Sequence, residues 1–369
     1  MTTTPRSHRV TRVSRTVSAA VATALILAAC GGGGSNTADT GDASGSSTTL
    51  AGSAPVEPVY PLTGLPITDE AAAKRVAIVV KIDNHPQSRP QTGLNKADIV
   101  YEENVESLTR FGAVFHSQGS DPVGPVRSGR TQDIDMFASM NNPLFVWSGG
   151  NARVTKAVNA SDMVNVGHSA SRGKGGYYRE KTRKAPHNLY AKTTNLWTLA
   201  PEEGAPPVQQ YSYRGPSDAR PATAVTVDGA KVSMYNVKVY WKWDAATSSF
   251  LRFTQNIKGE LEPHESDGSQ VSAKNVLVLY HTYLRSKADR KSPHADTTGK
   301  GVGFVLTDGS AIPVTWTRTD RELPYEIKDA TGAVVRLIPG NTWIQVAFKN
   351  TFAQVDPGVD PKKVKWPAI

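Results

Sequence analysis

The chain has one cysteine among its 369 residues, Cys30. A single cysteine cannot form a disulfide within the chain, so packing and hydrogen bonds must hold the fold together. Two catalytic signatures are also absent: the Gly-x-x-x-x-Gly-Lys-Ser/Thr phosphate loop and the Gly-x-Ser-x-Gly nucleophile turn. The sequence therefore gives no support to Walker-type nucleotide hydrolysis or to acyl-enzyme chemistry on serine or cysteine.

A run long enough for a membrane-spanning helix is missing at the N-terminus as well. Residues 1–29 carry a positive segment followed by a short apolar run at 17–29, and the positive charges are Arg6, Arg9, Arg12 and Arg15. This order of charge and apolar length predicts a secretory signal peptide rather than a spanning helix.

The apolar run ends in Leu27-Ala28-Ala29-Cys30. This tetrapeptide is similar to the bacterial lipobox, in which the cysteine receives a diacylglycerol and becomes the new N-terminus. An ordinary signal peptide with an accidental cysteine is the alternative. The lipobox reading makes membrane lipid a partner through Cys30 and anchors the protein to the outer face of the cytoplasmic membrane.

The formal net charge of +9 is partly a property of the leader. Without the four leader arginines, 38 basic residues stand against 33 acidic ones, a net charge of +5. That balance suits a protein beside anionic lipid or anionic wall polymer. It does not require nucleic acid as a partner, and an extracytoplasmic location argues against one.

Residues 30–59 are rich in Gly, Ser, Thr and Ala and have almost no large apolar side chain. Such a segment buries too little surface to fold, so we expect a lipidated flexible linker. A coil of this length has an r.m.s. span of roughly 30 Å.

The pattern of residues 60–220 predicts an α/β domain with a mixed sheet and flanking helices. Short apolar runs predict strands at 75–82, 97–103, 111–117 and 143–147. Helical spacing predicts a turn at 69–74 and helices at 131–140 and 152–159.

Residues 221–369 change to short strands separated by turn residues, which predicts a mainly β C-terminal domain. The expected strands are 222–227, 237–243, 250–254, 275–282, 302–306, 312–317, 334–338 and 343–348. The whole chain is therefore predicted to be an α+β protein of two folded domains, 60–220 and 221–369, behind a leader and a linker.

Several ordered segments carry a family resemblance. They are Pro61-Leu-Thr-Gly-Leu-Pro66, Ile82-Asp-Asn-His-Pro86, Arg89-Pro-Gln-Thr-Gly93, Ala97-Asp-Ile-Val-Tyr-Glu102, Gly124-Pro-Val-Arg-Ser128, Ala185-Pro-His-Asn-Leu-Tyr190, Asn275-Val-Leu-Val278 and Pro339-Gly-Asn-Thr-Trp-Ile344. Together they resemble the YerB-like lipoproteins of bacteria, which pair an N-terminal and a C-terminal domain. The resemblance implies a surface lipoprotein and supplies no established activity. The family pattern is expected to read Ser-Ala-Arg where this chain has Ser128-Gly129-Arg130.

Charged residues concentrate between positions 83 and 130, next to predicted strands, where ligands bind in open α/β sheets. Gly124-Pro-Val-Arg-Ser-Gly-Arg130 lies between a predicted strand and a predicted helix, which makes Ser128 a candidate helix cap. Free amides and arginine forks at such a position suit a carboxylate or phosphate. The candidate ligand-binding residues here are Asn84, His85, Arg89, Arg127, Ser128 and Arg130; an internal ion-pair network is the alternative.

The acids in this stretch are Asp83, Glu102 and Glu103. Adjacent strand residues point to opposite faces, so Asp83 and one glutamate can meet at the sheet edge. Two carboxylates in unequal environments are the minimum apparatus for glycosidic cleavage. Structural pairing of these acids with arginines is the alternative.

A second basic feature, residues 172–184, interleaves six positive residues with glycines and two tyrosines. Outside the cytoplasm it suits an anionic glycopolymer or phospholipid, and a solvated loop is the alternative. His187 and Asn188 follow at once, and we expect them to bring this loop toward Asp83.

No metal and no cofactor are expected, because the segments around His264 and His294 each offer only two ligands. The leading prediction is an envelope module that binds an anionic cell-envelope glycan or a cell-wall protein through a cleft between the domains. The alternative is a cell-wall enzyme using Asp83 with Glu102 or Glu103.

Overall fold

The computed structural model describes residues 57–368. Cys30, the signal peptide and most of the predicted linker lie outside the described residues, so what the sequence predicts for them stays a prediction. Within residues 57–368 no helix has both the length and the apolar character needed to cross a bilayer.

An 11-stranded mixed sheet organises the described chain, with the strand order β21-β20-β19-β16-β22-β2-β3-β1-β4-β5 and β8 added on β20. The N-terminal half contributes β1 (Ile78–Asp83), β2 (Ile99–Val105), β3 (Leu108–Phe115), β4 (Leu144–Val146) and β5 (Val164–Asn165). The C-terminal half contributes β8 (Val225–Thr226), β16 (Asn275–Tyr280), β19 (Gly299–Thr307), β20 (Ser310–Arg318), β21 (Glu326–Asp329) and β22 (Thr342–Ala347).

The two halves join where β2 pairs in parallel with β22, with Ile99 opposite Thr342 and Glu103 opposite Val346. One continuous sheet therefore runs through both predicted domains. The boundary near residue 220 stays a prediction, and any division there has to accommodate this shared sheet.

A second sheet has the order β12-β11-β10-β9-β23, with β15 added on β11. Its strands are β9 (Gly229–Met234), β10 (Val237–Asp244), β11 (Ser249–Gln255), β12 (Leu261–Pro263), β15 (Ser272–Ala273) and β23 (Phe352–Val355). Three two-stranded ribbons complete the strands: β6 (Tyr178–Arg179) with β7 (Leu189–Tyr190), β13 (Glu265–Ser266) with β14 (Ser269–Gln270), and β17 (Thr282–Arg285) with β18 (Pro293–Asp296).

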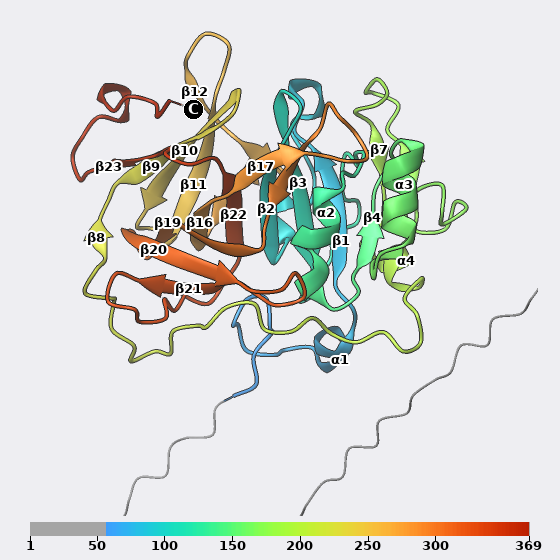
Figure 1. The fold of residues 1–369 in the computed structure, drawn as a ribbon, viewed down its shortest axis with the longest axis horizontal. Coiled ribbons are helices and arrows are strands. Elements are labelled where there is room, and N and C mark those ends of the chain that lie inside the picture. Colours follow the sequence, from blue (N-terminus) through green and yellow to red (C-terminus); the bar gives the residue numbers. More distant parts are fainter. Residues whose placement is uncertain (1–56, 369) are drawn as a thin grey trace, which may run out of the picture. The chain divides into compact units, whose positions relative to one another are not determined.

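The helices of the described region are short: α1 (Glu70–Lys74), α2 (Gln132–Met136), α3 (Ala152–Asn159) and α4 (Thr193–Trp197), with 3-10 turns at Pro86–Ser88, Leu94–Lys96, Ala138–Met140 and Pro361–Lys363. Figure 1 shows α3 and α4 beside β4, on the side of the sheet that the N-terminal half forms. The α+β class predicted from the sequence is confirmed.

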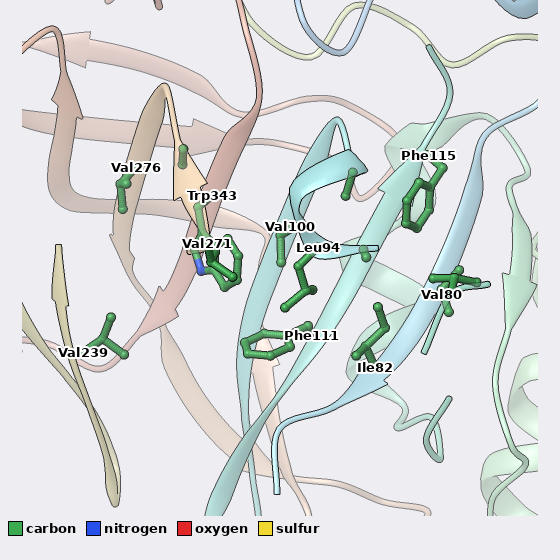
Figure 2. Packing of buried hydrophobic residues seen from close by; sticks show 14 of the residues in the cluster. Val80, Ile82, Leu94, Val100, Phe111, Phe115, Val239, Val271, Val276 and Trp343 are labelled. Atoms are coloured by element: carbon green, nitrogen blue, oxygen red, sulfur yellow. The ribbon is translucent and has the colours of Figure 1, made fainter. Parts of the chain in front are cut away.

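Apolar side chains cover the large sheet on both faces. One cluster joins Ile82, Phe111 and Trp343 to Val239 of the second sheet and to Val271, which lies between β14 and β15 (Figure 2). The other cluster packs the opposite face against side chains of α2 and α3, including Met136, Val154 and Val158. This double covering agrees with the burial of all six β1 residues, of which four are apolar and two, Lys81 and Asp83, are charged.

Candidate functional site

The candidate site lies at the carboxyl ends of parallel strands. β1 runs parallel to β4, and β4 runs parallel to β5, so their C-terminal ends share one edge. Residues 124–130 enter this edge: the backbone N–H of Arg127 donates to Lys81 O (2.8 Å), and that of Ser148 donates to Arg127 O (3.0 Å). Asp83 ends β1 at the same edge, as the sequence predicts.

Asp83 is the centre of the site. Its Oδ2 lies 2.6 Å from Nδ1 of His187 and 3.2 Å from Nε of Arg127. Its Oδ1 accepts a hydrogen bond from the backbone N–H of His85 (3.1 Å). Asp83 is only 3% exposed, so these contacts replace water around a buried carboxylate.

His85 and His187 stack face to face, with ring centroids 4.3 Å apart and an interplanar angle of 18°. The residues come from the end of β1 and from the loop before β7, which lie about a hundred positions apart. Burial, with the neighbouring His187 as the second cause, lowers the pKa of His85, so its ring is neutral at pH 7.

Arginines surround this centre. Arg110 is opposite Asp83 in the β1–β3 pairing, and its Nη1 donates to the carbonyl of Ser128 (2.8 Å). Burial lowers the pKa of Arg110 to about 10, with Arg130 as the next cause. The side chain of Arg127 is 23% exposed, its Nε has no hydrogen-bond partner in residues 57–368, and no hydrogen bond from its Nη atoms to these residues is present.

The other two candidate residues of segment 124–130, Arg130 and Ser128, make contacts within the protein. Arg130 donates to Glu106 Oε1 from Nε (3.0 Å) and Nη2 (2.5 Å). The prediction that Ser128 caps a helix is wrong: α2 begins at Gln132 with Thr131 at the cap position, and no side chain caps it. The Ser128 carbonyl is used by Arg110 instead, and its hydroxyl lies 3.4 Å from that of Ser148.

Asn84 and Arg89 make their side-chain hydrogen bonds within the protein. Asn84 is fully buried, donates to Thr109 Oγ1 (2.7 Å) and accepts from Nη2 of Arg89 (2.9 Å). Arg89 continues to Thr254 Oγ1 of the second sheet (3.0 Å), and burial lowers its pKa to about 10. These residues tie the two sheets together.

Glu102 is sealed inside the core and cannot pair with Asp83 over a substrate. Its carboxylate accepts from Arg252 Nη2 (2.9 and 3.0 Å), Thr109 Oγ1, Trp343 Nε1 and Gln345 Nε2. Both Glu102 and Arg252 have no exposed side-chain surface. The predicted alternative of ion pairing is what the structure shows, with Arg252 from the C-terminal half as the partner.

Glu103 is equally buried, on the opposite face of β2 from Glu102. Lys81 contacts Glu103 and also lies 2.8 Å from Oδ1 of Asp133. Burial, followed by the nearby Asp133, raises the pKa of Glu103 to about 7. The two carboxylates thus share one buried lysine, and neither reaches a cleft.

The basic loop returns to Asp83 through His187, as expected. Asn188 does not join the site; it accepts from Arg179 Nη1 (2.8 Å) and donates to the carbonyls of Glu180 and Arg183, which fixes the loop. Arg183 in turn donates to the carbonyls of Ser88 and Pro90. The remaining basic side chains of this loop are exposed: Arg172, Lys174, Arg179, Lys181 and Lys184.

A pocket of about 470 Å³ adjoins the edge and is lined by residues 147–150, 165 and 167–170 among others. Ser148 belongs to both the pocket and the segment that holds Arg127. In the described part of the chain no three His, Cys, Asp or Glu side chains converge in a way that could hold a metal ion.

The fold and this edge define a mixed-sheet α+β protein with a buried Asp–His–Arg centre. Family models match the chain in two consecutive parts, "Protein of unknown function (DUF3048) N-terminal domain" over residues 62–206 and "Protein of unknown function (DUF3048) C-terminal domain" over residues 230–344. The chain belongs to the YerB-like family.

A sequence relative agrees with that membership, and a solved structure shares the fold. The chain is 29% identical over 315 residues to "Putative lipoprotein YerB" of Bacillus subtilis (strain 168), which covers 81% of this chain and 88% of the relative. It also shares the fold of the crystal structure of YerB protein from Bacillus subtilis, with a TM-score of 0.66 and 23% identity over 79% of this chain and 97% of that one.

Proposed function

We propose that the protein is a membrane-anchored envelope lipoprotein that binds an anionic cell-envelope glycan at the carboxyl edge of β1 and β4. Kinship with a protein named a lipoprotein supports the envelope location. The lipid on Cys30 supplies the anchor, and the folded region presents the edge to polymer outside the membrane.

The observation that carries the binding proposal is the state of Arg127. Its Nε lies 3.2 Å from a carboxylate oxygen of Asp83, an ion pair that lacks hydrogen-bond geometry. Its Nη atoms make no hydrogen bond to a described residue, although Arg110 and Arg130 beside it are paired with Ser128 and Glu106. A partly exposed guanidinium whose donors make no hydrogen bond to the described residues is suited to bind a carboxylate or phosphate group.

The loop of residues 172–184 widens this cationic surface. It carries five exposed basic side chains and is fastened beside the site by Arg183 and His187. A repeating anionic polymer gains from several weak contacts spread along its length, so the loop and Arg127 together suit a polymer better than a small ion.

The binding test compares wild type with Arg127→Ala on a purified anionic wall polysaccharide, with dextran as an uncharged polymer. Loss of charge-assisted hydrogen bonds should weaken binding about tenfold or more, and added salt should weaken wild-type binding too. Arg336→Ala is the matched control, since Arg336 is exposed and pairs with Asp218 away from the site. Equal affinity of wild type and Arg127→Ala overturns the proposal.

The anchor is tested separately. Cys30→Ser removes the thiol that would carry the lipid, so the protein should move from the membrane fraction into the medium. Fractionation followed by immunoblotting measures this. A Cys30→Ser protein that stays in the membrane fraction contradicts lipid anchoring.

The alternative function, a carbohydrate-active enzyme, lacks support because the paired carboxylates that it needs do not meet at a cleft. Glycosidic cleavage uses two carboxyl groups across a cleft, and both glutamates are buried in internal ion pairs. Asp83 remains alone at the edge, engaged by His187 and Arg127.

A further inference from the structure

Both stacked histidines use Nδ1 in a hydrogen bond within the protein and leave Nε2 without a partner in the described residues, but those bonds place the ring proton differently. Nδ1 of His187 lies 2.6 Å from a carboxylate oxygen of Asp83, which can only accept, so Nδ1 carries the proton. Nε2 of His187 is therefore a lone-pair acceptor when the ring is neutral.

His85 has the opposite tautomer. Its Nδ1 accepts a hydrogen bond from the backbone N–H of Gln87 (3.2 Å), so the proton of the neutral ring is on Nε2. Burial lowers the pKa of His85 and keeps it in this neutral, donating form. Neither Nε2 has a hydrogen-bond partner in residues 57–368, and neither belongs to the polar atoms sealed from solvent.

The acceptor of His187 and the donor of His85 thus belong to stacked rings whose centroids lie 4.3 Å apart, and Arg127 lies against the same Asp83 carboxylate that His187 contacts. We infer that this cluster is a catalytic centre for the hydrolysis of carboxylic esters, with His187 as general base and His85 and Arg127 as donors to the oxyanion. For its natural substrate, an O-acyl group on the bound polymer, the inference rests on the binding function proposed above.

The reaction balances with water as the only co-reactant. Nε2 of His187 takes a proton from water while the water oxygen bonds to the ester carbonyl carbon. The carbonyl oxygen becomes an oxyanion that accepts from Nε2–H of His85 and from the Arg127 guanidinium. The C–O bond to the alcohol then breaks, and the leaving alkoxide takes the proton back from His187, which yields one acid and one alcohol.

The geometry favours an ester over a phosphodiester. At a tetrahedral carbon the attacking oxygen and the oxyanion are bonded to the same atom, so an acceptor and a donor on two stacked rings suit this pair of oxygens. In-line displacement at phosphorus places attacking and leaving oxygens on opposite sides, where two adjacent stacked rings do not reach both.

Asp83 acts as a positioning residue in this scheme. It holds the His187 tautomer and compensates the imidazolium that forms, as the acid of a Ser-His-Asp triad does. Asp83→Asn should lower kcat while KM changes little, and Asp83→Glu should restore part of kcat. A purely structural role would lower the amount of folded protein without this split.

The deciding assay follows hydrolysis of p-nitrophenyl acetate by the mature protein, with bis(p-nitrophenyl) phosphate as the competing chemistry. Wild type should hydrolyse the acetate with saturation and leave the phosphodiester intact. His187→Gln should lose about 100-fold or more in kcat/KM, and His85→Gln about 10- to 100-fold.

His294→Gln is the matched control, because His294 also pairs with an aspartate, Asp135 (3.3 Å), but lies outside the site. It should keep the wild-type rate, and circular dichroism should confirm that each variant is folded. If His187→Gln misfolds, His85→Gln decides, since His85 is only partly buried.

Wild-type activity no higher than buffer, activity unchanged in His187→Gln or His85→Gln, or cleavage of the phosphodiester in preference to the acetate each overturns the inference. Binding to anionic polysaccharide is measured independently of this assay. Failure of the ester assay with intact binding therefore refutes the catalysis alone.

Discussion

The ion pair between Glu102 and Arg252 has a structural role rather than a catalytic one. Each side chain is fully buried, and the pair joins β2 of the large sheet to β11 of the second sheet. Removing one partner leaves an uncompensated buried charge, which typically costs about 3–5 kcal/mol. We therefore expect Arg252→Met to lower the free energy of unfolding by about that amount in a denaturant titration.

Two further variants make this prediction sharp. Glu102→Gln combined with Arg252→Met should recover much of the loss, because both charges are then gone. Arg321→Met, which breaks a partly exposed pair with Asp162, should cost less than about 1 kcal/mol. If Arg252→Met lowers the free energy of unfolding by an equally small amount, the buried charge of Glu102 does not need Arg252 for its stabilisation, and the prediction is wrong.

Among single residues, the sequence predicts best those whose place in the fold follows from the residues next to them in the chain. Asp83 was placed at a strand end by the apolar run before it and by the turn residues after it. Glu102 and Glu103 looked similar, but their partners Arg252, Lys81 and Asp133 lie on other elements. Nothing local in the sequence marks Arg252, which sits 150 positions from Glu102, as the cation of the core.

Among the helices and strands, those with a clear apolar periodicity and a capping residue are predicted correctly from the sequence. The predicted helix at 152–159 matches α3, whose cap Asn151 accepts from the N–H groups of Arg153 and Val154. The predicted helix at 131–140 is instead α2 followed by a 3-10 turn: the α-helix has its C-cap at Phe137, whose backbone (φ −102°, ψ 3°) leaves the helical region, and Asn141, with a left-handed φ of 59°, ends the turn. The predicted strand at 334–338 makes only isolated bridges, from Val334 to Lys328 and from Leu337 to Tyr213.

Four strands of the second sheet, β9, β12, β15 and β23, are not among the predicted ones. β9 begins at Gly229 and carries polar residues among its apolar ones, although all six are buried. β23 is a four-residue strand that pairs with β9. Short strands that contain polar residues lack the apolar–polar alternation from which a strand is predicted. Their stability comes from the strands and side chains packed against them.

For the whole molecule, the pairing of β2 with β22 is the decisive feature. It makes the sheet continuous between regions that two separate family models match. Sequence patterns cannot reveal such a pairing, because parallel strands more than two hundred residues apart carry no shared turn or register signal. The sheet predicts that both halves unfold together.

Trp343 on β22 is the place to test this coupling. It packs against Phe111 and Trp241 and donates to Glu102, so Trp343→Ala should cost about 3–5 kcal/mol. Hydrogen exchange in denaturant should then show β1 and β10 losing protection at the same, lowered midpoint, whereas the exposed Val334→Ala should shift neither. Because β22 belongs to the C-terminal half, retained protection of β1 beside unprotected β10 would contradict a single cooperative unit and show that the N-terminal half folds alone.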